Sequence, residues 1–171
     1  MAAPLSIRRL VETDLADYKR LRDTALADHP DAFTSDPAPE RVAGSYRSRL
    51  GLERPDGGEF TIGAWREGVL LGAVSIERDE RRKVHHIGHL IGMMVRADAQ
   101  GQGIGGALLD ACIREARAAS GLEMLTLTVT SGNRSAVQLY ERAGFTRYGQ
   151  LPHAIKVDGV YHSKDQMVLT L

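Results

Sequence analysis

The sequence lacks several features that would assign the protein to a specialised class. It has one cysteine, Cys112, so neither an internal disulfide nor a cysteine-rich metal site is available to it. No apolar run reaches the roughly 18 residues that a membrane-spanning helix needs. The segment Met1 to Leu10 lacks the apolar core, about seven residues or longer, that marks a signal peptide. We therefore expect a cytoplasmic protein with no membrane partner.

An excess of positive charge is also missing. The chain has 171 residues, with 22 Lys and Arg balanced by 22 Asp and Glu. Proteins that bind nucleic acid or anionic membranes through bulk electrostatics carry a net positive surface. The balance argues against such partners, and we expect no nucleic acid. The apolar content of 43% supplies an ordinary core, so we predict a single domain over residues 1–171.

The spacing of apolar and turn residues predicts an α/β fold in the order β-α-α-β-β-β-α-β-α-β-β. The predicted elements are a strand at 5–11, a helix capped at 13–14 and reaching 27, a helix at 40–50, a turn at 51–58, strands at 60–65, 69–77 and 85–95, a helix at 103–119, a strand at 122–129, a helix at 131–143, and strands at 145–155 and 160–171. Residues 60–95 read as an antiparallel meander. Together they predict one mixed, mostly antiparallel sheet flanked by about four helices.

Glycine is abundant, with 18 residues, and it gathers between a predicted strand and a predicted helix. The cluster is Gln100, Gly101, Gln102, Gly103, Ile104, Gly105 and Gly106. Backbone N–H groups converge there with the helix dipole, and glycine allows close approach, so the loop suits a pyrophosphate. A glycine-rich turn that merely packs a helix on a sheet is the alternative interpretation of the cluster alone.

A dinucleotide fingerprint is the first phosphate-binding hypothesis, because Gly101, Gly103 and Gly106 satisfy G-x-G-x-x-G. The context differs from that of a nicotinamide-dependent enzyme. Three antiparallel strands precede the loop, five residues separate it from the strand that ends at Val95, and Glu123 begins the next strand instead of ending it. A Walker A loop is absent too, since no Gly-Lys-Ser or Gly-Lys-Thr occurs.

A second hypothesis rests on two motifs together. The pattern Gln100-x-x-Gly103-x-Gly105 follows a strand that ends Met93-Met94-Val95, and one helix and one strand later comes Asn133-x-x-Ala136-x-x-Leu139-Tyr140-x-x-x-Gly144-Phe145. The pair resembles the acetyl-coenzyme A motifs of the GNAT superfamily of N-acetyltransferases. The resemblance extends over essentially the whole chain, including a closing strand at Tyr161–Met167. Many relatives carry an acid two residues after that tyrosine, where this chain has Ser163.

The resemblance implies acetyl-CoA as co-substrate and direct attack by a primary amine in a ternary complex. It implies that backbone groups of Met93, Met94 and Val95 hold the pantetheine arm and the thioester carbonyl, and that the loop from Gln100 to Gly106 holds the pyrophosphate. Asn133 would bind the pantetheine, and Tyr140 would protonate the leaving thiolate. Seven residues, two helical turns, separate these two, so both side chains are expected to face the cofactor groove.

Three candidates remain for the base that accepts the proton of the acceptor amine. Relatives often place a glutamate eleven residues before the motif glutamine, and this position holds His89, an imidazole able to accept a proton near neutral pH. Glu77 on the preceding strand is the second candidate, and water is the third. No metal is expected, because His85 and His86 face opposite ways on a strand and no Cys or carboxylate completes a ligand set. We expect Cys112 to pack in the core without forming an acyl intermediate.

The acceptor is expected to bind between residues 28–46 and 150–162. Candidate contacts there are His29, Asp31, Phe33, Glu40 and Tyr161. The lack of a strong acidic run argues mildly against a basic polypeptide, so a small amine or amino-acid-like acceptor is preferred. A protein N-terminus or lysine as acceptor, and a non-catalytic acyl-CoA-binding module, remain alternatives, and a homodimer is an open possibility.

Overall fold

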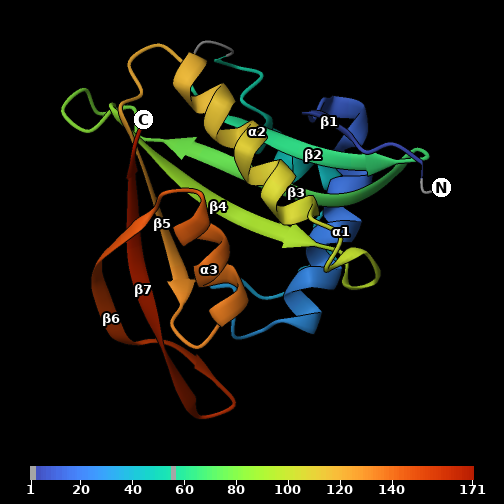
Figure 1. The fold of residues 1–171 in the computed structure, drawn as a ribbon. Coiled ribbons are helices and arrows are strands. Elements are labelled where there is room, and N and C mark those ends of the chain that lie inside the picture. Colours follow the sequence, from blue (N-terminus) through green and yellow to red (C-terminus); the bar gives the residue numbers. More distant parts are fainter. Residues whose placement is uncertain (1–2, 55–56) are drawn as a thin grey trace.

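A seven-stranded sheet forms the centre of the structure, a computed structural model that describes residues 3–54 and 57–171 (Figure 1). The strands are β1 (Ser6–Arg9), β2 (Phe60–Arg66), β3 (Val69–Arg78), β4 (Ile87–Val95), β5 (Met124–Thr130), β6 (Thr146–Val157) and β7 (Val160–Thr170). Their spatial order is β1-β2-β3-β4-β5-β7-β6. Neighbours run antiparallel except β4 and β5, which are parallel.

Helices cover both faces of the sheet. Helix α1 (Leu15–Asp28) and the 3₁₀ helix η2 (Ala43–Leu50) share a hydrophobic cluster with one face, and α2 (Ile104–Ala118) with α3 (Arg134–Arg142) shares a larger one with the other. Figure 1 shows α2 lying across the sheet on the side opposite α1. None of the helices among the described residues is long and apolar enough to cross a membrane.

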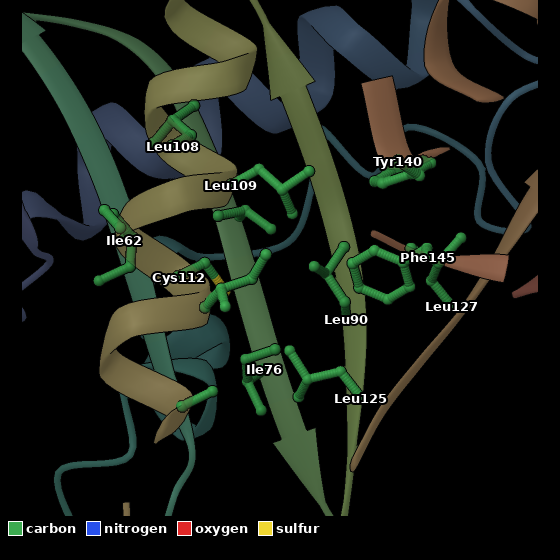
Figure 2. Packing of buried hydrophobic residues seen from close by; sticks show 14 of the residues in the cluster. Ile62, Ile76, Leu90, Leu108, Leu109, Cys112, Leu125, Leu127, Tyr140 and Phe145 are labelled. Carbon is green, nitrogen blue, oxygen red and sulfur yellow. The ribbon is translucent and has the colours of Figure 1, made fainter. Parts of the chain in front are cut away.

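The larger cluster shows why α2 forms and how it is held. Leu108, Leu109 and Cys112 recur at helical spacing and pack toward Ile62 and Ile76 of the sheet (Figure 2). Each fully buried aliphatic side chain contributes about 1.5–3 kcal/mol relative to an exposed one. Burial also raises the pKa of the Cys112 thiol to about 12, so it stays protonated at neutral pH and packs as predicted.

The predicted order of elements and the antiparallel meander, now β2, β3 and β4, are confirmed, with boundaries shifted by a few residues. Most shifts shorten the element, because apolar periodicity runs on into the flanking turns. Of the predicted turn at 51–58, Pro55 and Asp56 lie outside the described residues.

Two local predictions hold in position but differ in detail. The helix expected at 40–50 is the 3₁₀ helix Ala43–Leu50, and at its start both the backbone N–H and the hydroxyl of Ser45 donate to the Val42 carbonyl. That i to i−3 pattern is the one serine and glycine favour over an α-helical start. Asp14 is the N-cap residue of α1, as predicted, but its side chain makes no capping bond to that helix: it accepts hydrogen bonds from Arg8 and from the Val11 backbone, and Arg8 lowers its pKa.

The buried side chain of Arg78, at the end of β3, forms hydrogen bonds to three different loops. It is 4% exposed and donates to the carbonyls of Gly57 at 3.0 Å, Ser120 at 2.9 Å and His85. Ser120 follows α2 directly, so this contact fixes the far end of the helix whose N-terminus faces the candidate site.

Arg78→Met should therefore destabilise the fold strongly. It leaves three partly buried carbonyls without this donor, and we expect the free energy of unfolding to fall by about 2–4 kcal/mol. Denaturant unfolding of the variant measures the loss. The matched control Arg82→Met changes an exposed arginine in the following loop, and an equal loss in both variants would contradict the assigned role.

Candidate active site

Strands β4 and β5 separate shortly after they meet. Their parallel pairing covers Ile87–His89 against Met124–Thr126 and goes no further among the described residues. Figure 1 shows the two strands diverging beyond this point. The edge of β4 that faces β5 therefore carries backbone groups without a strand partner, and such groups need another partner, water or a ligand.

A bulge at Gly92 reshapes β4 just before the unpaired segment. The β3 partner changes from Ser75 opposite Ile91 to Ala73 opposite Met94, so β4 holds one extra residue. Gly92 takes the left-handed conformation, with φ of +60°, which a glycine adopts without steric cost. The bulge shifts which side of the sheet Met93 and Met94 face.

A cavity of about 850 Å³ fills the wedge between the strands. It is lined by residues from the end of α1 and the loop after it, the end of β4, the glycine loop, the β5–α3 connection and β7. From the predicted set these are Met93, Met94, Val95, Gln100, Gly101, Gly103, Ile104, Gly105 and Asn133. One cavity thus collects most of the residues predicted to hold the cofactor, whereas Gln102 and Gly106 lie outside its lining.

The N-terminus of α2 opens into this cavity without a side-chain cap. Gly103 precedes the helix in the left-handed conformation and makes no capping bond. A β-carbon built on Gly101, Gly103 or Gly106 would meet nothing within 4 Å. Unpaired N–H groups at a helix N-terminus with open space before them fit a pyrophosphate.

Asn133 lines the cavity but also caps α3. Its Oδ1 accepts hydrogen bonds from the Ala136 backbone at 3.2 Å and from the Ser135 hydroxyl at 3.1 Å. Its side-chain N–H₂ is left as the group with which it would donate to a ligand.

Tyr140 does not share the cavity-facing side with Asn133, contrary to the expectation from their spacing. Asn133 precedes the helix with non-helical ψ of 76°, so two full turns do not separate the two residues. The side chains of α3 that line the cavity are Ser135, Ala136 and Leu139. Tyr140 is 6% exposed, packs edge-on against Phe145 with ring centroids 5.9 Å apart (Figure 2), and has its pKa raised by burial.

The two predicted bases lie together on the face that α1 and η2 cover, but not in the cavity lining. His89 and Glu77 are directly opposite each other on β4 and β3 and border a smaller hollow of about 290 Å³. The Nδ1 atom of His89 is 2.6 Å from the Thr126 hydroxyl, at the last paired position before β4 and β5 separate. Glu77 lies 3.7 Å from Arg49.

The acceptor side of the cavity matches the predicted segments in part. His29, Asp31, Phe33 and Tyr161 line it, and Glu40 does not. His162, at the end of the predicted segment, and Ser163, noted in the sequence for the missing acid, line it as well. Alternation on the final strand would have paired Ser163 with Tyr161, but it gives no signal for His162. No group of three His, Cys, Asp or Glu residues placed to hold a metal occurs within the described part of the chain.

A family model, curated relatives and solved structures all point to the same family. Residues 18–145 match the family described as Acetyltransferase (GNAT) family. Mycothiol acetyltransferase of Salinispora tropica is 32% identical over 128 residues, which cover 75% of this chain and 40% of that protein. The L-methionine sulfoximine/L-methionine sulfone acetyltransferase of Pseudomonas aeruginosa is 43% identical over 58 residues, 34% of this chain and 33% of that protein.

The chain thus spans two fifths or less of each of these curated relatives. A solved structure of a Salmonella typhimurium protein with its cofactor acetyl-CoA superposes with a TM-score of 0.86 at 23% identity, covering 99% of this chain and 95% of the other. The fold, the glycine loop before α2 and a family match over most of the sequence agree. The chain belongs to the GNAT family of acetyltransferases.

Proposed function

We propose that this protein transfers the acetyl group of acetyl-CoA to the primary amine of a small, amino-acid-like acceptor, by direct attack in a ternary complex. The single observation that carries the proposal is the continuous cavity that joins the uncapped N-terminus of α2 to the unpaired edge of β4. A donor with an anionic end and a thioester end needs both features in one groove.

Different groups of the chain would hold different parts of acetyl-CoA. The N–H groups from Gly101 to Gly106 would bind the pyrophosphate, and Asn133 would donate to the pantetheine arm. The backbone of Met93 to Val95 would hydrogen-bond the pantetheine and the thioester carbonyl, stabilising the negative charge that develops on that oxygen during attack. Holding donor and amine together also removes the entropic cost of their encounter.

Two protons have to move. The amine nitrogen attacks the carbonyl carbon, the carbon–sulfur bond breaks, the nitrogen loses a proton and the departing thiolate gains one. We assign the second transfer to Tyr140, whose raised pKa keeps its hydroxyl protonated. Because Tyr140 lies outside the cavity lining and next to the lining residue Leu139, the proton would pass through a bridging water. His89, Glu77 or water takes up the first proton, and His29 and His162 are the two imidazoles that already line the cavity.

The relatives support a small acceptor. One acts on L-methionine sulfoximine and L-methionine sulfone and another is a mycothiol acetyltransferase. Both names describe small molecules rather than protein chains, in line with the preference drawn from the charge pattern.

Ligand binding and turnover test the proposed function together. Acetyl-CoA at 100 times its dissociation constant should stabilise the fold by about 2.7 kcal/mol and raise the melting temperature, while NADH should not. Thiol release should then follow addition of small amines or amino acids, and not of a basic peptide. Stabilisation by NADH alone would overturn the proposal, stabilisation without turnover would indicate a binding module, and turnover of the peptide alone would indicate a protein acceptor.

Gly103→Asp should abolish acetyl-CoA binding while the protein stays folded. The new carboxylate would stand at the N-terminus of α2, where it repels a pyrophosphate and takes its N–H groups. Calorimetry on the variant measures the loss. Gly68→Asp is the matched control, since Gly68 has φ of +76° against +77° at Gly103 and equally open surroundings, but lies in the β2–β3 turn. Unchanged affinity in Gly103→Asp would show that the loop holds no phosphate.

Tyr140→Phe should lower kcat by about 100-fold with little change in acetyl-CoA affinity, because it removes the hydroxyl and keeps the ring that packs on Phe145. Steady-state kinetics and calorimetry on the purified variant measure both quantities. Tyr148→Phe, at an exposed tyrosine of β6, is the control. A thiol with pKa near 8.5 is itself a fair leaving group, so a variant that retains more than about half of kcat would reject the role of proton donor.

A further inference from the structure

Two arginines and a tyrosine converge on the bulge of β4 with polar atoms left unpartnered. A β-carbon built on Gly92 would lie 3.9 Å from Arg22 Nη1, 3.9 Å from Tyr18 Oη and 4.0 Å from Arg49 Nη1, and these are its nearest neighbours. These are ordinary van der Waals distances, so the small space in front of the Gly92 backbone is bordered by three hydrogen-bond donors.

Two of the three donor residues, Tyr18 and Arg22, are buried, and each of the three has an unpartnered polar atom. Arg22 is 6% exposed and Tyr18 is 1% exposed. Arg22 Nε, Tyr18 Oη and Arg49 Nη1 have no hydrogen-bond partner among the described residues. An arginine cannot shed its charge in a protein, and a buried charge without a partner costs several kcal/mol. Buried polar groups in native structures are normally paired with protein, ordered water or a ligand.

The charges nearby do not balance. Among the described residues, Glu77 is the carboxylate that pairs with Arg49. The Arg49 Nη1 and Glu77 Oε1 atoms are 3.7 Å apart, which is too long for a hydrogen bond, and the Glu77 side chain is half-exposed. Arg22 has the ring of Tyr46 at 5.7 Å from its Cζ atom, which supplies a cation–π contact but no acceptor atom. Within the part of the chain that the structure describes, the cluster therefore keeps an excess positive charge.

The cluster adjoins the inner end of the donor cavity along two elements. Tyr18, Arg22, Ala25 and His29 follow one another at spacings of four, three and four, so they share one face of α1. Ala25 and His29 line the cavity. On β4, Gly92 directly precedes Met93, which also lines it. An anion held by Arg22 and Arg49 would thus lie next to the strand that faces the thioester.

We infer that Arg22, Arg49 and Tyr18 bind the carboxylate of the acceptor, so that the protein acetylates the amine of a free amino acid. The inference rests on the proposed acetyl transfer and specifies its substrate class. A planar carboxylate matches the fork of a guanidinium, and a third bond from the Tyr18 hydroxyl fixes its orientation. In an α-amino acid the amine lies two bonds from the carboxylate carbon, which brings it close to the unpaired edge of β4.

Matched acceptor pairs test the inference. L-Methionine sulfone and its carboxamide share side chain and amine and differ in the charge of one group, and further amino acids can be paired in the same way. We expect kcat/KM for each reactive acid to exceed that for its carboxamide by about 100-fold or more, because the amide would leave buried cations unpaired. Arg22→Met should remove most of this preference, lowering kcat/KM for the acid and leaving the carboxamide nearly unchanged.

Arg41→Met is the matched control. The Arg41 Cζ atom lies 5.8 Å from the same Tyr46 ring, but this arginine is exposed. We expect it to retain the preference for the acid. Equal effects of the two variants would indicate that Arg22 only packs on Tyr46 and would overturn the inference.

A readout without catalysis separates binding from folding. Because a buried unpaired charge destabilises the free protein, ligand-free Arg22→Met should melt at the same temperature as the parent or higher. Tyr18→Phe, which removes one neutral donor, should raise KM for the acid by about 10-fold with kcat little changed. A large drop in the melting temperature of Arg22→Met would assign the arginine to structure alone.

The outcomes also distinguish the inference from the proposed function. If acid and carboxamide are acetylated equally well, the carboxylate site is wrong and acetyl transfer stands. If acetyl-CoA gives neither stabilisation nor transfer to any acceptor, both are wrong.

Discussion

The early end of the hydrogen-bond ladder between β4 and β5 is the constraint on which the rest of the structure depends. Three residues on each strand pair, and beyond them the strands separate. Backbone groups in a sheet interior are normally paired, so the gap is stable only where water or a ligand enters it. The segments that surround the gap come from five different parts of the chain: the end of α1 with the loop after it, the end of β4, the glycine loop, the β5–α3 connection and β7.

The bulge at Gly92 serves two surfaces at once. By adding a residue to β4 it changes which side of the sheet the following methionines face, so that Met94 packs with α1 while Met93 contacts the cluster around α2. Because it has a positive φ and no side chain, it also leaves Arg22, Arg49 and Tyr18 as the nearest groups in front of its backbone. A single glycine therefore shapes both the cavity edge of β4 and the surface of β4 that faces the two arginines.

Sequence reasoning succeeded where the chemistry is local. The order of elements follows from periodicity, and the glycine loop was expected to border a binding groove because its backbone groups are neighbours in the chain; most of its residues do line the cavity. Sequence reasoning did not reveal that Tyr18, Arg22 and Arg49 meet at Gly92. Up to 74 positions separate these residues, and nothing in the sequence around any one of them indicates such a cluster. Tyr18 appears in the pattern as a core residue of a helix. Sequence reasoning also misplaced the side chain of Tyr140. The expectation that Asn133 and Tyr140 lie two helical turns apart assumed that the helix had already begun at Asn133.

Buried arginines have two different environments in this fold. Arg78 donates to backbone carbonyls from three loops, whereas Arg22 packs against Tyr46 and its Nε atom has no partner among the described residues. The cavity residues proposed to hold the donor lie between positions 93 and 133, while the arginines at the bulge come from the first fifty residues. Substitutions in α1 and η2 thus offer evolution, or a protein engineer, a way to exchange one acceptor for another while the acetyl-donor half of the groove keeps its sequence.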